Sequence, residues 1–547
     1  MKFLRKLALI FFLPVILIVS SGFYYGSDTY FEIKKNFTIF SEIFEEVSRR
    51  YVVEVDPGEM MRTAVGAMLE SLDPYTSLID ETGSREMDIV TTGQYAGVGL
   101  EVGARGGKLV VIAPIEGYSA HRMGVRAGDV IISVNGISVR DFNPEDLQTQ
   151  LRGEAGTSVT LVVQRFGIEE DLEFELVRES IEVKNVIWAG FIDDEKGVGY
   201  VLLQRFGQNA AQEVADAIKK MDETQNLNAL VLDLRNNPGG LLDEAVMLAD
   251  LFVESGIDVV STKGRLPETN FSYQTRIDPI YTDRPLFVLQ NSGSASASEI
   301  VSGAIQDLDL GVVIGERSFG KGLVQIVRPL SYNMAIKITT SKYYTPSGRS
   351  LQSIEYLSEE ETAGIDVPDS VRQSFTTRAG REVFEGLGIE PDVEISEHSL
   401  SLLEIALLRN SHYFFFANQF YSKNESFPES KSREDIFEAF MAYLEAEEFS
   451  FETRAQRNYN NLIASLSADV VQNSSEKIES LRVLLEQDKE AMMSENRDYI
   501  IRELMLEIIS RYEGASGRLK KSLKDDPMTL KAKDLVADSD SYFAILQ

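Results

Sequence analysis

Apolar runs of strand length alternate with runs of helical spacing between Val186 and Val393, and this alternation restricts the fold more than any other feature of the sequence. The runs that suit buried strands are Val198–Leu203, Ala229–Leu234, Leu286–Leu289 and Val312–Ile314. The runs of helical spacing between them are Ala210–Met221, Leu241–Val253 and Ser298–Leu308. Strands that alternate with helices pack as a sheet with crossover connections. The sequence therefore predicts an α/β core, which we place at residues 179–396.

The rest of the chain divides into segments with other patterns. Residues 27–92 carry apolar side chains at helical spacing, as in Ile39–Val47. Residues 93–178 contain short strands and glycine turns, and the order of these elements resembles a PDZ domain. Residues 397–547 are helical in pattern, charged and without a catalytic signature. The predicted fold class is thus multidomain α/β, with N-terminal helices, a PDZ domain, an α/β core and a helical C-terminal extension.

The N-terminus has the layout of an export signal. Met1–Lys6 is basic, Leu7–Val19 is apolar apart from one proline, and Val19–Ser21 offers small residues for cleavage. Apolar character resumes at Phe23–Tyr25, so an uncleaved anchor also fits. We expect residues 1–26 to be a signal peptide or a membrane anchor. The protein is then exported to the cell envelope, either periplasmic or anchored in the inner membrane.

Composition excludes several classes of function. The chain has 54 Lys and Arg against 86 Asp and Glu, a formal net charge of −32, which argues against nucleic acid as a partner. It has no cysteine, which excludes disulfides, thiol catalysis and thiolate metal sites. Histidine occurs only three times, so a catalytic serine in this chain could need a different base. We expect no metal and no cofactor.

A run of alternating small residues, Asn291–Glu299, joins a predicted strand to a predicted helix. A serine at such a tight turn can be exposed as a nucleophile. Ser296 and Glu299 also have the spacing of a capping box, which explains both residues structurally. The positive helix end would stabilise an oxyanion beside the same serine. These arguments favour Ser296 over Ser294 and Ser298 without excluding the other two.

Lys321 lies in Gly315–Gly322, which is almost a phosphate-binding loop. Two features oppose that interpretation. A glycine stands where the magnesium-binding hydroxyl should be, and Leu323–Val327 looks like a strand, whereas a phosphate loop opens a helix. Lys321 could instead be a general base, because a desolvated lysine can remove a proton from serine. A solvated lysine in a turn remains the simpler structural alternative.

A third motif, Asp233–Leu241, ends an apolar strand and opens a helix. Sites in α/β sheets gather at the carboxyl ends of strands. Gly239 and Gly240 permit close approach of the backbone, so their N–H groups could bind an oxyanion. Taken alone, the motif could equally be an ordinary loop that starts a helix.

Several motifs occur in one order along the chain: Asp233–Gly240, Ser294–Glu299, Phe319–Gly322 with Gln325, and Tyr344–Arg349. With this set of motifs the chain resembles the carboxy-terminal processing, or tail-specific, proteases, which are serine peptidases with a Ser-Lys dyad. Leu72–Thr76, the PDZ region and Gly388–Asp392 extend the resemblance to roughly residues 35–395. The segment Ile354–Thr377 and the C-terminal extension depart from the common core of the family.

The resemblance implies a role for each matched residue. Ser296 is the nucleophile, Lys321 the general base, and Gln325 the residue that positions the lysine. The backbone N–H groups of Ala297 and of Gly239 or Gly240 form the oxyanion hole. The implied activity is that of a serine endopeptidase that cleaves proteins near their C-termini.

The PDZ resemblance implies how substrates bind. PDZ domains bind a C-terminal peptide as an added strand and hold its carboxylate with backbone N–H groups. Gly97, Val98, Gly99 and Leu100 occupy that position here, and Arg152 resembles an arginine that couples the PDZ domain to the protease core. Expected partners are protein substrates, and the membrane if the N-terminal segment is uncleaved; self-association is left open. The alternatives are a non-catalytic PDZ adaptor and a nucleotide-binding protein.

Overall fold

The computed structural model describes residues 30–80, 83, 89, 92–353, 356, 372–424, 426–428 and 431–547. The predicted signal peptide or anchor at residues 1–26 lies outside them. The chain divides into two compact units, one made of the described residues up to Ile79 with Val327–Ile338 and the other of the remainder.

The smaller unit is mainly helical, as predicted. A helix over residues 30–50 is followed by α2 (Pro57–Glu70), which Asp56 caps by accepting the N–H groups of Gly58 and Glu59. The strand β1 (Ser77–Ile79) pairs antiparallel with the start of β18 (Ala335–Tyr344). Among the described residues, no helix has the length and apolar character needed to cross a membrane.

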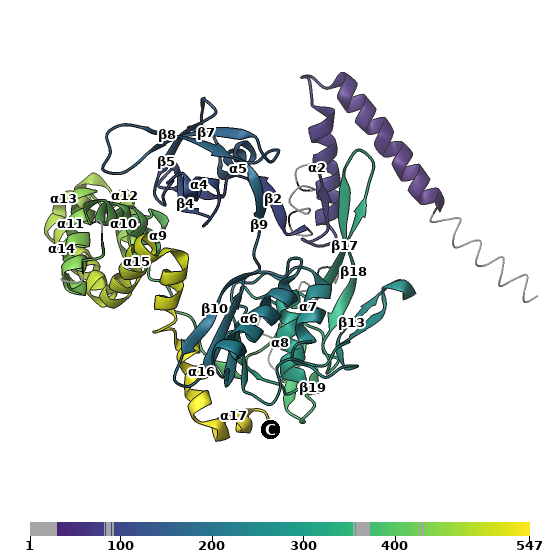
Figure 1. Cartoon of the computed structure of the whole chain (residues 1–547). Coiled ribbons are helices and arrows are strands. Elements are labelled where there is room, and N and C mark those ends of the chain that lie inside the picture. Colours follow the sequence, from purple (N-terminus) through teal and green to yellow (C-terminus); the bar gives the residue numbers. More distant parts are fainter. Residues whose placement is uncertain are drawn as a thin grey trace, which may run out of the picture. The chain divides into compact units, whose positions relative to one another are not determined.

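The PDZ region is built on a sheet with the strand order β3-β4-β5-β7-β8, with β6 beside β5. Figure 1 labels β4, β5, β7 and β8 of this sheet. The strands are β3 (Leu100–Arg105), β4 (Lys108–Pro114), β5 (Val130–Val134), β6 (Ile137–Ser138), β7 (Ser158–Gln164) and β8 (Leu172–Val177). The helices are α4 (Ser119–Arg122) and α5 (Pro144–Leu151). A separate two-stranded sheet joins β2 (Gln94–Gly97) to β9 (Glu179–Glu182). In this strand order β3 is an edge strand.

The α/β core contains a six-stranded sheet with the order β10-β11-β12-β15-β16-β21. Its strands are β10 (Val186–Asp193), β11 (Val198–Leu203), β12 (Ala229–Asp233), β15 (Leu286–Gln290), β16 (Val312–Gly315) and β21 (Val393–Glu394). All neighbouring pairs are parallel except β10 with β11. Smaller elements complete the core: β13 (Asp258–Gly264), a 3₁₀ turn (Pro267–Thr269), β14 (Phe271–Gln274), β17 (Leu323–Pro329), β19 (Ser374–Thr376) and β20 (Glu382–Phe384).

Helices from distant parts of the chain cover the two faces of this sheet. Side chains alternate along β12, so that Leu230 and Leu232 face one cluster and Ala229 and Val231 face the other. The first cluster includes residues of α6 (Ala210–Thr224), α7 (Leu242–Ala249) and α8 (Ala297–Asp307). The second includes residues of α16 (Pro527–Ala537) and α17 (Ser539–Ile545). The end of the C-terminal extension is thus part of the core, which the sequence pattern did not indicate.

The remainder of the extension is helical, as predicted. Its helices are α9 (Leu402–Arg409), α10 (His412–Lys423), α11 (Arg433–Ala446), α12 (Arg454–Ser465), α13 (Ala468–Asn473), α14 (Ser475–Glu495) and α15 (Arg497–Ser522). Their core contains Tyr413 and Phe416 of the aromatic run, packed against residues such as Phe440 and Ile500. Helix α15 is interrupted at Gly514, where the backbone leaves helical geometry.

Candidate active site

Ser296 lies at the turn between β15 and α8, at the carboxyl end of a central strand. Its φ is 56° and its ψ is −112°, a strained conformation for a residue with a side chain. Strain of this kind persists only where the surroundings enforce it, and it concentrates at functional sites. The side chain is 6% exposed, so the turn presents the hydroxyl at the edge of the sheet with little access to bulk water.

The two flanking serines are engaged in structural hydrogen bonds. The Ser294 hydroxyl donates to the Leu234 carbonyl at 2.8 Å, and the Ser298 hydroxyl donates to the Asn237 carbonyl at 2.9 Å. Both side chains are fully buried. Their hydroxyls tie the serine run to the turn that follows β12. The sequence alone had only favoured Ser296, whereas the structure gives the three serines different contacts.

Glu299 joins Ser296 to Lys321. Its Oε2 atom accepts the Ser296 N–H at 2.8 Å and the Lys321 N–H at 2.9 Å. Its Oε1 atom accepts the Ser318 hydroxyl at 2.6 Å and the Gly320 N–H at 2.7 Å. Because one oxygen binds both backbones, the serine turn and the lysine loop are held side by side. The sequence had identified Glu299 only as a helix cap.

The Glu299 carboxyl is completely buried, and its surroundings act on it in opposite directions. Burial raises its pKa, while the hydrogen bonds from Ser318 and from three backbone N–H groups counteract part of that rise. These four partners all donate to the carboxylate. A side chain with hydrogen-bond donors of its own would fit these contacts poorly.

Lys321 ends the loop that Glu299 binds, and Gln325 lies in the strand β17 that follows. Lys321 is half-buried, and the chain then enters the strand β17 rather than a helix, which rules out the phosphate-binding loop. The neighbouring Gly322 N–H donates to the side chain of Gln352 at 2.9 Å. The Gln325 amide donates to the Thr339 hydroxyl at 3.2 Å.

Tyr343 is a residue near the serine that the sequence had not indicated. Its phenol forms a hydrogen bond with the Ser296 hydroxyl, and its side chain is 5% exposed. Burial raises the pKa of the phenol, and the bond with Ser296 offsets part of this rise. Its backbone N–H donates to the Gly322 carbonyl at 2.8 Å, which fixes β18 beside the lysine loop. Tyr343 immediately precedes the Tyr344–Arg349 motif, and that position was the only signal in the sequence.

The two glycines after β12 have different surroundings. The Gly239 N–H donates to the Asn237 side chain at 2.9 Å. Gly239 has a φ of 95°, and an added Cβ would lie 2.7 Å from the Ala295 carbonyl oxygen and 2.8 Å from the Ala297 nitrogen. Gly240 forms a parallel bridge with Phe206. The bonds of this bridge run from the Phe206 N–H to the Gly239 carbonyl and from the Leu241 N–H to the Phe206 carbonyl, so the Gly240 N–H takes no part in it. Gly239 therefore supplies the close approach to the serine turn.

Charged residues anchor the base of the same turn. Arg235 forms a bidentate pair with Asp233, with bonds of 3.1 Å and 2.6 Å, and the Tyr200 hydroxyl also donates to Asp233. The remaining Arg235 nitrogen binds Asp526 of the C-terminal extension at 2.7 Å. The sequence motif contained Asp233 and Arg235 but could not indicate their distant partner.

The predicted peptide-binding residues lie beside the edge strand β3. The carbonyls of Val98 and Gly99 accept the N–H groups of Ala120 and Ile115, which fixes the loop before β3. Helix α5 runs next to β3. Arg152, at the end of α5, lies over the Tyr95 ring at 5.1 Å and donates to Gln148 at 3.3 Å. Both contacts are inside the PDZ region, and neither involves the core.

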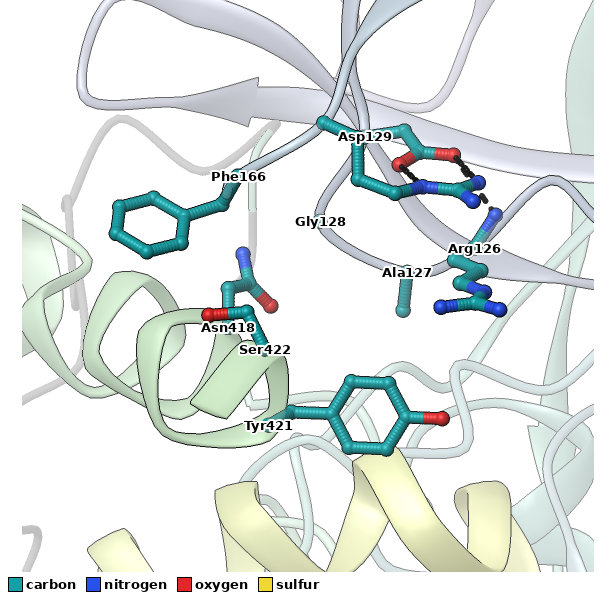
Figure 2. Close-up of a pocket in the computed structure, with 9 residues that line it drawn as sticks. Arg126, Ala127, Gly128, Asp129, Phe166, Asn418, Tyr421 and Ser422 are labelled. Carbon is teal, nitrogen blue, oxygen red and sulfur yellow. Dashed lines mark hydrogen bonds and ion pairs between the residues drawn. The ribbon is translucent and has the colours of Figure 1, made fainter. Parts of the chain in front are cut away.

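A separate pocket lies between the PDZ region and α10, away from the serine (Figure 2). Its lining includes Arg165, which pairs with Asp129 at 2.7 Å, and the side chains of Phe166, Asn418 and Tyr421. None of the predicted site residues lines it. Within the described part of the chain, no cluster of three or more His, Asp or Glu residues is arranged to hold a metal ion.

Comparison with known proteins agrees with this architecture. Residues 197–359 match peptidase family S41, residues 110–165 match the PDZ domain, and residues 403–536 match the C-terminal helical domain of a probable PDZ-protease. The chain is 39% identical over 323 residues to the carboxy-terminal-processing protease of Bartonella bacilliformis, covering 58% of this chain and 73% of that protein.

Two further similarities have lower sequence identity. A probable CtpA-like serine protease of Staphylococcus aureus is 34% identical over 320 residues, covering 58% of this chain and 62% of the relative. The solved structure of the photosystem II D1 C-terminal processing protease shares 27% identity and covers 66% of this chain and 92% of its own. Its TM-score of 0.36 is too low to support a structural argument.

The fold and these matches define a serine-type peptidase that carries a PDZ domain. The chain belongs to the family of carboxy-terminal-processing proteases, within peptidase family S41.

Proposed function

We propose that this peptidase is an endopeptidase that cleaves proteins near their C-termini, with Ser296 as the nucleophile and Lys321 as the general base. The observation that carries the proposal is that one oxygen of the Glu299 carboxylate accepts the backbone N–H groups of both residues. A base must lie within reach of the proton that it removes, and this shared oxygen supports the proposal because it holds the two backbones close together.

Acylation follows from these roles. The neutral Lys321 amine removes the Ser296 proton as the hydroxyl oxygen attacks the scissile carbonyl carbon, and the carbonyl oxygen becomes an oxyanion. The N–H groups of Ala297, at the first turn of α8, and of Gly240 stabilise that charge. We choose Gly240 over Gly239 because the Gly239 N–H is already bonded to Asn237.

Proton transfer completes the cycle. The protonated lysine donates its proton to the leaving amine as the peptide bond breaks. It then takes a proton from a water molecule that attacks the acyl-enzyme, and returns that proton to Ser296. In this scheme Gln325 helps to position Lys321, and Tyr343 orients the Ser296 hydroxyl in the resting enzyme.

Substrate binding is proposed between β3 and α5. The free edge of β3 suits an added peptide strand, and the fixed loop Gly97–Leu100 stands where the terminal carboxylate would bind. We also propose that Arg152 couples peptide binding by the PDZ domain to the activity of the protease core. The signal-like pattern of residues 1–26 supports export to the cell envelope, as a periplasmic or a membrane-anchored protein.

Cleavage of an unstructured protein such as casein tests the dyad. We expect both Ser296→Ala and Lys321→Ala to abolish turnover, whereas Ser292→Ala, a change to an exposed serine in the same run, retains it. Undiminished turnover by Ser296→Ala or by Lys321→Ala would refute the assignment. A wild-type protein inert toward every peptide offered would favour the PDZ adaptor.

A further inference from the structure

The C-terminal extension reaches the catalytic edge of the core through the start of α16. Met528, Ala532 and Leu535 of this helix pack on the second face of the central sheet. Asp526 caps the helix by accepting the Thr529 N–H at 2.8 Å with one oxygen. Its other oxygen binds Arg235. The same carboxylate therefore starts the helix and contacts the core.

This contact is well removed from water. The side chains of Arg235 and Asp526 are 15% and 14% exposed. Arg235 also contacts the Met528 sulfur at 3.8 Å. Burial raises the pKa of the Asp526 carboxyl, but the charge of Arg235 and the hydrogen bonds from Arg235 and Thr529 outweigh burial and leave this pKa lowered. Without the Asp526 charge, one end of the buried guanidinium would lose its anion while Asp233 still binds the other end, so the guanidinium would be held from one side only.

Arg235 begins the turn that approaches Ser296. The next residue, Asn236, donates its N–H to the Asn291 side chain at 2.9 Å. The Asn237 carbonyl accepts the Ala295 N–H at 3.0 Å and the Ser298 hydroxyl. Gly239 then packs directly against the backbone on both sides of Ser296. The position of this turn therefore sets the distance between the glycine N–H groups and the nucleophile.

We propose that Asp526 is a positioning residue of the peptidase: by holding the Arg235 guanidinium, it fixes the turn Asn236–Gly240 and with it the proposed oxyanion hole beside Ser296. This inference rests on the proposed function. It assigns a catalytic requirement to the C-terminal extension, at a residue far outside the segment that matches peptidase family S41.

The test compares Asp526→Asn with Asp538→Asn in the full-length protein. Asp538 is also an aspartate N-cap in the extension, but it is exposed and its side chain bonds to Ser541 of α17. We expect Asp526→Asn to lower kcat on casein by about tenfold or more with little change in KM, since a displaced oxyanion donor costs ~10²–10³ in kcat. Asp538→Asn should retain wild-type kcat.

A second variant separates positioning from loss of folding. Arg235→Gln should also lower kcat, and adding Asp526→Asn to it should cause little further loss, because the interaction is already absent. All rates are expressed per folded molecule, determined by calorimetry at the assay temperature. A wild-type kcat in Asp526→Asn, or independent losses in the double variant, would overturn the proposal. The proposed dyad would survive either result as long as cleavage by the wild-type protein still requires Ser296.

Discussion

The two sides of Ser296 are held by different kinds of interaction. On the lysine side, the Glu299 carboxylate binds three backbone N–H groups and one hydroxyl. On the glycine side, Arg235 is fixed between Asp233 and Asp526, both of which carry the opposite charge. The first arrangement is local to the serine and lysine motifs, whereas the second depends on a residue 291 positions away in the chain.

This difference suggests how the site is assembled. Because backbone N–H groups cannot move independently of the chain, Glu299 holds the geometry of two loops once the core has folded. A guanidinium on a flexible side chain needs partners on more than one side to stay in place. We therefore expect activity to be sensitive to the exchange of a carboxylate for an amide on the lysine side. On the glycine side, we expect it to be sensitive to added side-chain volume and to the loss of a charge.

Glu299→Gln should have the largest effect. The amide NH₂ of glutamine cannot accept the N–H groups that one carboxylate oxygen now binds, so the serine turn and the lysine loop should separate. We expect kcat on casein to fall by about 10³-fold or more, since the nucleophile and its base must stay in hydrogen-bond reach. Steady-state kinetics measures the loss.

Glu244→Gln is the matched control for this change. Glu244 is also buried and accepts two backbone N–H groups, of Asn209 and Ala211, at the start of α6. Its replacement should lower the melting temperature while leaving kcat of the folded protein unchanged. Equal losses of kcat in both variants would mean that Glu299 is important only for folding.

Gly239→Ala should have the next largest effect. The new methyl group would overlap the Ala295 carbonyl at a positive φ, so the glycine turn should move away from Ser296. We expect kcat to fall by about 10²-fold, the usual scale for one misplaced oxyanion donor. Gly256→Ala is the control, because Gly256 also has a positive φ but no atom lies near its added Cβ. Similar kinetics for the two variants would contradict the role of Gly239.

Tyr343→Phe should have a smaller effect on the same reaction. It removes one hydrogen bond to the Ser296 hydroxyl and keeps the packing, so a several-fold loss in kcat is expected, equivalent to ~1 kcal/mol. Tyr281→Phe is the control: Tyr281 is also buried, and its hydroxyl donates to the Pro285 carbonyl away from the site. A wild-type kcat in Tyr343→Phe would show that this hydrogen bond does not orient the nucleophile.

The pH dependence of stability should differ in sign between the two sides. The lowered pKa of Asp526 stabilises the fold above the pKa of an unfolded aspartate, about 3.9, and this contribution disappears as pH falls through the lowered value. The raised pKa of Glu299 has the opposite effect. It destabilises the fold where the carboxyl is ionised, and this destabilisation disappears as pH falls through the raised pKa toward the pKa of an unfolded glutamate, about 4.3. Denaturant unfolding of wild type, Asp526→Asn and Glu299→Gln across this range measures both slopes. Slopes of the same sign for the two residues would contradict the assignment.

Local pattern was enough to predict the architecture. The apolar run Ala229–Leu234 and the helical spacing in Ala210–Met221 are visible in the sequence, and the structure has β12 at Ala229–Asp233 and α6 at Ala210–Thr224. The strand after Lys321 was also predicted from its residues, and it is what excludes the phosphate-binding loop.

The missing parts of the site depend on contacts between distant segments. A capping box explains Glu299 completely at the level of sequence, and nothing in its own helix reveals the Ser318, Gly320 and Lys321 donors. Tyr343 is one of many strand tyrosines until β18 is seen beside the serine turn. Asp526 belongs to a helical extension with no catalytic signature, so only the packing of α16 reveals its contact with Arg235.

The proposed Ser296–Lys321 dyad is tested most directly by mass spectrometry of the enzyme quenched in acid during turnover of a peptide ester. We predict an acyl adduct on the peptide that contains Ser296 in the wild-type protein and no adduct in Lys321→Ala. An adduct on Ser294 or Ser298, or an undiminished Ser296 adduct in Lys321→Ala, would contradict it.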